Sequence, residues 1–412
     1  MHILFLTDNF PPEGNAPATR TYEHTREWVK QGHQVTIITC APNFPDGKVF
    51  NGYKNKWISK EVLDGINVWR VKTYITANEG FFKRTLDFLS FMISSFFFGL
   101  FTKKVDVVIG TSPQFFTVIS AWALAKLKRA PFVFELRDIW PASITAVGAM
   151  QKSRVISVLE KVEMFLYRQA DSIVSVTHSF KKELIHRGVD KRKIEVVLNG
   201  VDLTTYKPVT HKDTRLAKAY GLKDKFVIGY IGTHGLAHAL DKVVEAAELL
   251  IDNDEIKFVF AGGGADKPRI ERLVQEKGLK NIALISRQPK EKMPQLWSLC
   301  DISLVHLKNT PLFKTVIPSK IFESMGMGLP LIISAPEGEA TKLVESKEAG
   351  VVIPPESPKR LVEAIQFLKQ NRKVLKAYSD SSTENATYYS REKQAADMLS
   401  VLEKLLDNNQ VA

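Results

Sequence analysis

Short, uninterrupted apolar runs recur along this chain, and helical segments separate them. The first run, residues 2–7, stops at Asp8, and a helix is predicted over 18–31, closed by Gly32. A second run follows at 34–39. Continuous apolar runs of this length are typical of strands buried on both faces. Because strand, helix and strand in this order make a βαβ unit, the pattern predicts an α/β fold with doubly wound parallel sheets.

The same alternation occupies both halves of the chain. In the first half, strands are predicted at 105–109, 131–135, 172–176 and 194–198, and helices at 115–128, 155–170 and 180–187. In the second half, strands are predicted at 226–231, 257–261, 282–285, 302–305 and 330–334, and helices at 240–251, 268–277, 293–298, 319–327 and 357–370. A chain of 412 residues is also too long for one hydrophobic core. We expect two domains, 1–205 and 206–389, joined near 203–214, and a final helix at about 390–412 that could pack on either domain, including back on the first.

Charge and cysteine content narrow the class of protein. The formal net charge is +12, which favours anionic partners such as nucleic acid, anionic lipid or phosphorylated ligands without choosing among them. Cys40 and Cys300 match no metal spacing, so we expect two reduced thiols. The N-terminal apolar run lacks the basic segment of a signal peptide. We therefore expect a cytoplasmic protein.

Ligands of open α/β sheets bind beyond the carboxyl ends of the strands, so the loops there are the first candidates for a site. After the first strand, Gly14 permits close backbone approach, and the helix behind it offers free N–H groups to an anion. This loop lacks the GxGxxG spacing of dinucleotide-binding oxidoreductases. After the strand at 131–135, Arg137 and Asp138 stand beside Trp140. That set suits either a binding site or a structural ion pair.

Two glycine-containing loops follow successive strands of the second half. Gly232, Thr233 and His234 come after its first strand, and Gly263 lies in a run of three glycines after the next. Glycines followed by a helix can cradle a phosphate group. Either loop alone is weak evidence, but two at one edge of one sheet favour a phosphate site.

The most specific segment spans residues 313–332. Pro318 can start a helix whose first turn carries Ser319 and Lys320, with Glu323 one turn further on. Backbone N–H groups and an ammonium can hold a diphosphate, and the carboxylate can accept hydrogen bonds from ribose hydroxyls. Taken alone, the same pattern also fits an amphipathic helix with a solvated lysine and glutamate.

This segment resembles the nucleotide-binding signature of the family-four retaining glycosyltransferases, in which two glutamates eight residues apart precede a strand. The motif Gly32-His33-x-Val35 and the turn Asn199-Gly-Val-Asp202 agree with that family, and the resemblance spans nearly the whole chain. It implies the GT-B fold, in which two Rossmann-like domains face a central cleft. More narrowly, the regions around 137–141 and 318–323 resemble the branch that transfers N-acetyl-L-fucosamine, or a related sugar, in O-antigen and capsule synthesis.

The resemblance implies transfer, with retention, from a UDP-sugar to a polyprenyl-diphosphate-linked saccharide, without a bound metal or other cofactor. It implies that the first domain binds the acceptor and the second binds the nucleotide sugar. The residues implied in catalysis are Asp138, Arg137 and Lys320. Those implied in binding the nucleotide sugar are Gly14, Gly232, Thr233, His234, Gly263, Arg287, Thr315, Ser319 and Glu323.

Three departures from the family pattern bear on the site. Thr315 stands in place of the first glutamate, which contacts the donor sugar in the family. The Arg and Lys that usually grip the diphosphate are missing from 232–241, and Lys320 and Arg287 are the nearest candidates to replace them. Arg137 stands where relatives often carry a histidine before the aspartate.

An apolar segment, residues 86–101, bears on a membrane partner. It carries six phenylalanines in sixteen residues, and basic residues flank it at 83–84 and 103–104. A bilayer span needs about twenty residues, so we do not expect this segment to cross a membrane. It could be a buried helix or a shallow interfacial anchor. The basic helix 152–168 would add to a face for anionic lipid, which would place the protein peripherally on the inner face of the cytoplasmic membrane.

Two other functions remain open from the residues. A sugar-nucleotide epimerase of the same fold would use a small soluble substrate and would need no membrane-facing helix. A nucleic-acid-binding protein would explain the charge of +12, but we find no compact basic and aromatic motif, so no nucleic acid is expected as a partner.

Overall fold

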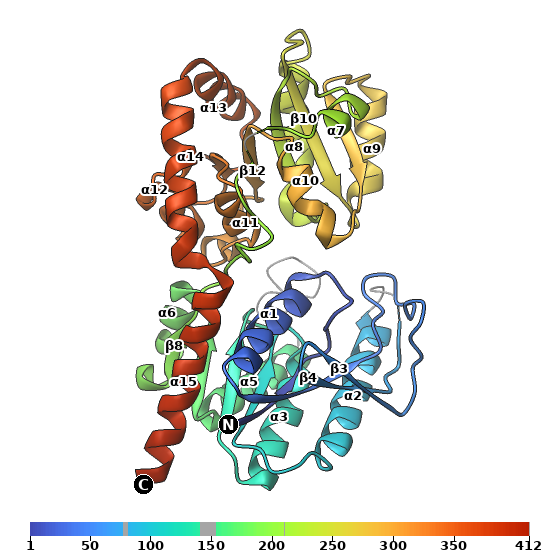
Figure 1. Cartoon of the computed structure of the whole chain (residues 1–412), viewed down its shortest axis with the longest axis vertical. Helices are drawn as coiled ribbons and strands as arrows, with labels where there is room; N and C mark the ends of the chain where they lie inside the picture. Colours follow the sequence, from blue (N-terminus) through green and yellow to red (C-terminus); the bar gives the residue numbers. More distant parts are fainter. Residues whose placement is uncertain (77–80, 141–153, 210, 412) are drawn as a thin grey trace. The chain divides into compact units, whose positions relative to one another are not determined.

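The computed structural model describes residues 1–76, 81–140, 154–209 and 211–411. The chain divides into two compact units. One unit comprises Met1–Leu198 together with Arg391–Ala412, and the other comprises Asn199–Ser390. The chain therefore passes from one unit to the other at 198–199 and returns at 390–391 (Figure 1).

The first unit is built on an eight-stranded sheet with the strand order β3-β4-β2-β1-β5-β6-β7-β8. Its strands are β1 His2–Leu6, β2 Gln34–Cys40, β3 Ile58–Leu63, β4 Ile66–Val71, β5 Val107–Thr111, β6 Phe132–Leu136, β7 Ser172–Ser175 and β8 Ile194–Val196. Its helices are α1 Ala16–Lys30, α2 Phe81–Gly99, α3 Phe115–Lys128, α5 Arg154–Gln169, α6 His178–His186 and α15 Arg391–Val411. Every strand pair is parallel except β3 with β4.

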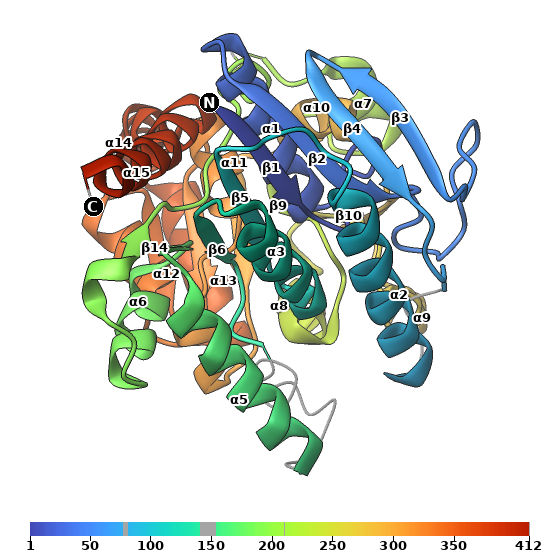
Figure 2. The ribbon, with the colours of Figure 1, turned by 90° about the horizontal axis from the view of Figure 1, so that it is seen from below.

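Helices cover both faces of this sheet, which explains why β1, at its centre, is buried throughout. β1 lies between β2 and β5, and all five of its residues are buried. On one face, α1 and α15 pack together, and the indole Nε1 of Trp28 donates to the carbonyl oxygen of Ala395 at 2.9 Å. On the other face, α3 lies between α2 and α5 (Figure 2). A Cβ on Gly99 would lie 2.4 Å from Leu124, so glycine permits the close packing of α2 on α3.

The second unit is built on a six-stranded, wholly parallel sheet with the order β11-β10-β9-β12-β13-β14. Its strands are β9 Phe226–Ile231, β10 Ile256–Gly262, β11 Ile282–Ser286, β12 Ile302–His306, β13 Leu331–Ser334 and β14 Gly350–Ile353. Its helices are α7 Thr214–Ala219, α8 Leu240–Leu249, α9 Lys267–Glu276, α10 Met293–Trp297, α11 Lys320–Gly326, α12 Glu339–Ser346, α13 Pro358–Gln370 and α14 Arg372–Ala386. The prediction of two doubly wound α/β sheets is confirmed.

Several elements are additional to those predicted from the pattern. The β3–β4 hairpin turns at Asp64-Gly65, a dipeptide that favours tight hairpins, and it makes the first sheet mixed at one edge. β14 adds a strand at one edge of the second sheet, α12 packs on β13 and β14, and the polar helix α14 packs against α11. The predicted helix at 319–327 is shorter in the structure, where α11 comprises seven residues, Lys320–Gly326.

Candidate active site

A buried ion-pair network lies beneath the carboxyl ends of the strands in the first unit. Arg20 on α1 pairs with Glu135 on β6, with 2.9 Å between Nε and Oε1, and neither side chain is more than 1% exposed. Arg20 also donates to the carbonyl oxygens of Val197 and Leu198, where the chain leaves this unit. The network therefore ties α1 to the centre of the sheet and to the last residues before the crossing.

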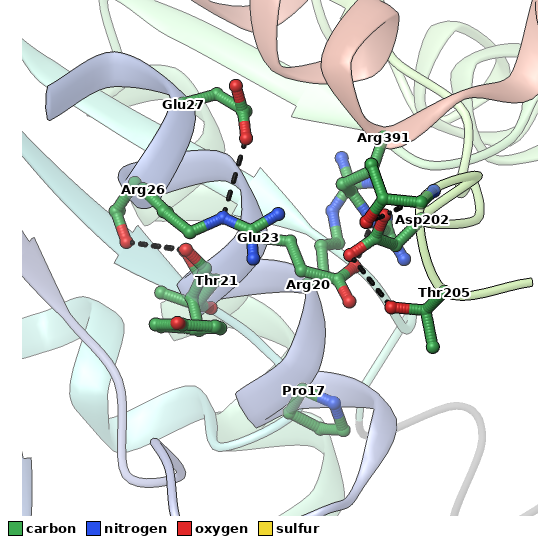
Figure 3. Close-up of polar contacts among 12 residues, drawn as sticks. Pro17, Arg20, Thr21, Glu23, Arg26, Glu27, Asp202, Thr205 and Arg391 are labelled. Carbon is green, nitrogen blue, oxygen red and sulfur yellow. Dashed lines mark hydrogen bonds and ion pairs between the residues drawn. The ribbon is translucent and has the colours of Figure 1, made fainter. Parts of the chain in front are cut away.

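The start of α15 is held by the same helix. Arg391 pairs with Glu23, with 2.5 Å between Nε and Oε2, and both side chains are buried (Figure 3). His24 lies beside Arg20 and Arg391, and burial together with these cations holds the pKa of its imidazole well below the usual value. Because Arg20 and Glu23 lie one turn apart on α1, one helix fixes both points at which the chain enters and leaves this unit.

Arg137, predicted as catalytic, extends this network towards the loop that precedes α1. Its Nη1 donates to the carbonyl oxygen of Pro17 at 3.2 Å, and burial lowers the pKa of its guanidinium to about 10. The backbone N–H groups of Arg137 and Asp138 both donate to the hydroxyl of Ser112 at the end of β5. Trp140 stacks on Phe115, with 5.1 Å between the ring centroids. The loop after β6 is thus held by α1 through Arg137, by Ser112 through two backbone N–H groups, and by α3 through Trp140.

Gly14 lies in the loop before α1, close to the residue that Arg137 contacts. A Cβ at Gly14 would meet nothing within 4 Å, so open space adjoins this backbone. Asn15 caps α1 by accepting from the backbone N–H of Ala18 at 3.0 Å. The structure therefore brings Gly14 and Arg137 to one edge of the first sheet.

Three carboxylates at this edge are absent from the predicted site. Asp8 follows β1, Glu13 lies in the loop before α1, and Asp87 lies on α2. Burial, together with the nearby charge of Asp8, raises the pKa of the Glu13 carboxyl and of the Asp87 carboxyl to about 7. Glu13 accepts from the backbone N–H groups of Asn43 and Phe44, each at 2.8 Å. The signal available in the sequence was Asp8, where the first apolar run stops.

In the second unit, the two predicted glycine loops lie against each other. The backbone N–H of His234 donates to the carbonyl oxygen of Gly263 at 2.9 Å. Gly262 has a φ of +147°, and a Cβ there would lie 1.9 Å from the carbonyl oxygen of Gly232. Only glycine permits this approach. The prediction that both loops form one edge of one sheet is confirmed by the pairing of β9 with β10.

Lys320 reaches this edge from the start of α11. Its Nζ lies 3.8 Å from the ring centroid of Tyr230 on β9, and a Cβ on Gly232 would lie 3.3 Å from the same nitrogen. The residue is 8% exposed, and within the described part of the chain its Nζ has no hydrogen-bond partner. Burial lowers the pKa of this ammonium to about 7, while the charge of Glu323 opposes the shift. A buried amine without a hydrogen-bond acceptor is suited to receive an anionic ligand.

His234 and His238 lie against the ring of Tyr230, and His306 contacts His238. His234 is fully buried, and neither ring nitrogen has a hydrogen-bond partner among the residues described. Burial lowers the pKa of His234 to about 4 and that of His238 to about 3. The Nδ1 of His238 contacts the carbonyl oxygen of His306, and the Nδ1 of His306 contacts that of His238. These two rings are held by reciprocal bonds, whereas His234 retains unused donor and acceptor capacity.

The remaining predicted residues of this unit fall into two groups. Arg287 follows β11 and lies beside Gly263, whose added Cβ would be 3.6 Å from that of Arg287. Thr233 is exposed on the first glycine loop. The backbone carbonyl of Ser319 accepts from the N–H of Glu323 at 3.2 Å, as the predicted helical spacing requires. The hydroxyl of Thr315 is turned back to the carbonyl of Leu312 at 2.9 Å.

The structure thus places Gly232, His234, Gly263, Arg287 and Lys320 at the carboxyl edge of the second sheet. For Thr315, the described contacts are local to its own turn. His238, His306 and Tyr230 belong to this edge and were not predicted. His306 is the last residue of β12, so its position at a strand end was the available signal.

Family models match both units. Residues 17–205 match the model described as Glycosyltransferase Family 4. Residues 212–385 match the model described as Glycosyl transferases group 1. The two matches together cover most of the chain and meet close to the passage between the two units.

Full-length similarity extends to a bacterial protein named as a colanic acid biosynthesis glycosyl transferase, WcaI of Escherichia coli K12. The two chains are 28% identical over 392 residues, which is 92% of this chain and 96% of WcaI. TuaH of Bacillus subtilis 168, named as a teichuronic acid biosynthesis glycosyltransferase, is 23% identical over 48% of this chain and 49% of its own length. The crystal structure of HepE from Anabaena with UDP and glucose superimposes with a TM-score of 0.74 at 15% identity, covering 98% of this chain and 100% of HepE. The likeness to HepE concerns the fold.

Proposed function

Because the chain is a GT-B glycosyltransferase with an N-terminal match to Glycosyltransferase Family 4 and a C-terminal match to Glycosyl transferases group 1, we propose that it transfers a sugar from a UDP-sugar to a lipid-linked saccharide. The product belongs to a bacterial surface polysaccharide. The observation that carries the proposal is the buried Lys320 ammonium at the edge of two glycine loops, where a diphosphate would find a cation and close backbone. Both family models describe transferases, so neither an epimerase nor a nucleic-acid-binding protein is retained.

The diphosphate of the donor is bound by Lys320, Arg287 and the backbone N–H groups of the two glycine loops. Negative charge grows on the leaving diphosphate as the sugar departs, and fixed donors in a dry site stabilise it without reorganisation. His234 supplies a further ring nitrogen from the same edge. The carboxylate of Glu323 accepts hydrogen bonds from the ribose hydroxyls of the nucleotide, and Ser319 and Thr315 lie on the same segment.

The donor sugar is an N-acetylated hexosamine such as N-acetyl-L-fucosamine, and transfer proceeds with retention. Support comes from the resemblance around Pro318–Glu323 and Arg137–Trp140, while Pro141 lies outside the described residues. Thr315 stands where the family has a glutamate, and its hydroxyl is satisfied by Leu312, so sugar contacts must come from other groups.

The acceptor is bound by the first unit, at the edge that carries Gly14, Arg137 and Asp138. Open space beside Gly14 and the position of the half-buried residue Arg137 at the same edge support this assignment. The saccharide is carried on a polyprenyl diphosphate. The relative WcaI is named for colanic acid biosynthesis and TuaH for teichuronic acid biosynthesis, and both names concern surface polysaccharides.

The first unit docks on an anionic membrane surface through α2. No helix among the described residues is both long and apolar enough to cross a bilayer. One stripe of α2 packs on the protein, with Phe91, Ser95 and Gly99 buried at helical spacing, whereas Ile93 and Phe97 on another stripe are 63% and 54% exposed. One face of α2 is therefore buried, and the exposed face is the one that we propose as the interfacial anchor.

Basic residues adjoin this exposed apolar stripe. Exposed cations stand on both sides of it, and α5 adds others beside its own exposed apolar residues. The cations are Lys83, Arg84, Lys103, Lys104, Arg154, Lys161 and Arg168, whereas Lys152 lies outside the described residues. An exposed apolar stripe that is flanked in the sequence by exposed cations suits an anionic leaflet, and it supports a peripheral position on the inner face of the cytoplasmic membrane.

The donor assignment is tested by calorimetric titration of the purified protein with UDP, GDP, ADP and CDP. We expect UDP to bind most tightly. Tight binding of a different nucleoside diphosphate would replace the donor class, and no binding of any would remove the proposal. Transfer is then measured with a panel of UDP-sugars and an organic extract of bacterial membranes. The anomeric configuration of the product, read by NMR, decides between retention and inversion.

A further inference from the structure

The amine of Lys320 occupies an environment in which a charge has little support. Its Nζ faces the ring of Tyr230 at 3.8 Å and has no hydrogen-bond partner among the described residues. An ammonium carries three N–H donors, and desolvating a charged group without acceptors is strongly unfavourable. The ring face and the more distant carboxylate of Glu323 are the attractions that the structure records for it.

The other titratable groups around Lys320 are not expected to take up a proton near neutral pH, so Lys320 is the group that does. They are Tyr230 on β9, His234 and His238 on the following loop, His306 at the end of β12 and Glu323 on its own helix. Burial raises the pKa of Tyr230 well above its usual value, so this phenol stays neutral. Burial lowers the pKa of each histidine, to about 4 for His234 and about 3 for His238, so these rings are neutral as well.

By contrast, burial brings the pKa of Lys320 to about 7. At mildly alkaline pH most of the empty protein therefore carries a neutral amine at this position. A diphosphate placed at the glycine loops would supply both the anionic charge and the hydrogen-bond acceptors that the ammonium lacks, and an adjacent opposite charge favours the charged form of a lysine.

We propose that binding of the nucleoside diphosphate at the glycine-loop edge is coupled to the uptake of one proton by the Nζ of Lys320. The proton comes from solvent or buffer and remains on the ammonium while the diphosphate is bound. The inference rests on the proposed donor function, because it names the ionisation that accompanies occupancy of that site. It also means that donor affinity falls as the pH rises above neutrality, since the free amine must be protonated at increasing cost.

Calorimetry with UDP measures this directly. UDP is titrated into the full-length protein at about pH 8, where UDP is fully ionised and a lysine of pKa about 7 is mostly neutral. The titration is repeated in HEPES and in Tris, whose ionisation enthalpies differ. We expect the observed heat to differ between the buffers by an amount equivalent to most of one proton taken up per UDP bound. The uptake should decline steadily as the pH is lowered below about 7.

Two variants assign the proton to its site. Lys320→Met replaces the buried amine with an apolar chain of similar length, and it should bind UDP more weakly with no buffer dependence at about pH 8. Lys320→Arg carries a permanent charge, so UDP binding by it should also be independent of buffer. Lys342→Met, at a lysine whose side chain is 69% exposed, is the matched control and should retain both the UDP affinity and the uptake.

The outcomes separate this inference from the function on which it rests. If UDP binds the wild-type protein with the same heat in both buffers, the coupling is wrong and the donor assignment stands. If uptake persists in Lys320→Met, the proton goes to another group and the assignment to Lys320 is wrong. If UDP does not bind at all, the proposed function itself fails.

Discussion

Arg20 and Glu135 are separated by 115 positions in the sequence and form an ion pair with 2.9 Å between Nε and Oε1. Neither side chain is more than 1% exposed. The attraction of Arg20 keeps the pKa of Glu135 below its usual value despite the opposing effect of burial. Since Arg137 and Arg391 lie near the same pair, the Glu135 carboxylate compensates more than one buried cation.

The first prediction concerns this pair. Glu135→Gln should destabilise the first unit by about 3–5 kcal/mol, because it removes the negative charge that is paired with the buried guanidinium of Arg20. Urea denaturation followed by circular dichroism measures the loss. The matched control is Glu363→Gln, which breaks an ion pair with Arg360 in which both side chains are more than half exposed, and it should change stability by less than about 1 kcal/mol. Equal effects of the two variants would show that the buried pair has no special role.

The second prediction concerns the pH dependence contributed by Glu13. The folded protein raises the pKa of this carboxyl from 4.5 to about 7, so the folded state holds its proton more tightly than the unfolded chain does. Ionising Glu13 therefore costs stability progressively as the pH rises from about 4.5 to about 7. Glu13→Gln removes this cost, and its Oε1 can still accept from Asn43 and Phe44.

We expect Glu13→Gln to gain stability relative to the wild-type protein across this interval, reaching about 1–3 kcal/mol above pH 7. Comparison of the two proteins cancels contributions from Asp8 and Asp87, which are present in both. Glu337→Gln, at a side chain that is 83% exposed, is the control and should show no such trend. A difference that does not change with pH would mean that Glu13 is ionised normally in the folded state.

The architecture could be predicted because the apolar runs are continuous and the strands they form are buried on both faces. β1 and β9 illustrate this, since every residue in each is buried. The hairpin of β3 and β4 lies at a sheet edge and alternates in exposure. Polar residues therefore interrupt its apolar pattern, and no continuous apolar run marks these two strands in the sequence. The helix α14 carries three serines, one threonine and one asparagine among its fifteen residues, and it packs against α11.

The loops of the candidate site could be predicted from the sequence, whereas the contacts between side chains in the site could not. Gly232, Gly263 and Lys320 were recognisable from local motifs, and the predicted set included His234. The sequence could not show that Lys320 faces Tyr230, because the contact joins residues 90 positions apart. Likewise, the carboxylates of Asp8 and Glu13 come from the loop between β1 and α1 and that of Asp87 from α2, and burial is what brings the pKa of two of them to about 7.

The third prediction concerns nucleotide recognition. Glu323→Ala should leave the fold intact and weaken UDP binding by about 1–3 kcal/mol, the cost of leaving ribose hydroxyls without a charged acceptor. Calorimetry measures the change. Glu339→Ala, at the start of α12, is a comparison with another acidic residue in the first turn of a helix, and UDP affinity should be unchanged by it. Unchanged affinity in Glu323→Ala would remove this glutamate from the site.

The fourth prediction separates binding from turnover at Lys320. Lys320→Ala should lower kcat more than it weakens nucleotide binding, since charge on the leaving diphosphate is greatest in the transition state. Steady-state kinetics with the UDP-sugar identified by the panel, together with UDP calorimetry, give the two quantities. Lys342→Ala removes a lysine whose side chain is 69% exposed and serves as the control. Full activity in Lys320→Ala would mean that this lysine has only a structural role.

The last prediction concerns the membrane face of α2. Phe97 is 54% exposed, whereas Phe91, on the stripe that packs inward, is 1% exposed. Phe97→Asp should therefore leave the protein folded and strongly reduce its co-sedimentation with vesicles that contain phosphatidylglycerol. Phe91→Asp should destabilise the first unit, because it places a carboxylate in the core.

Binding of the wild-type protein should fall steeply with salt and with loss of anionic lipid, since each cation at headgroup level contributes about 1 kcal/mol. If Phe97→Asp is folded and still binds vesicles as the wild type does, α2 is not the docking element. If Phe97→Asp unfolds the protein as Phe91→Asp does, its ring belongs to the core, and the docking face is wrong.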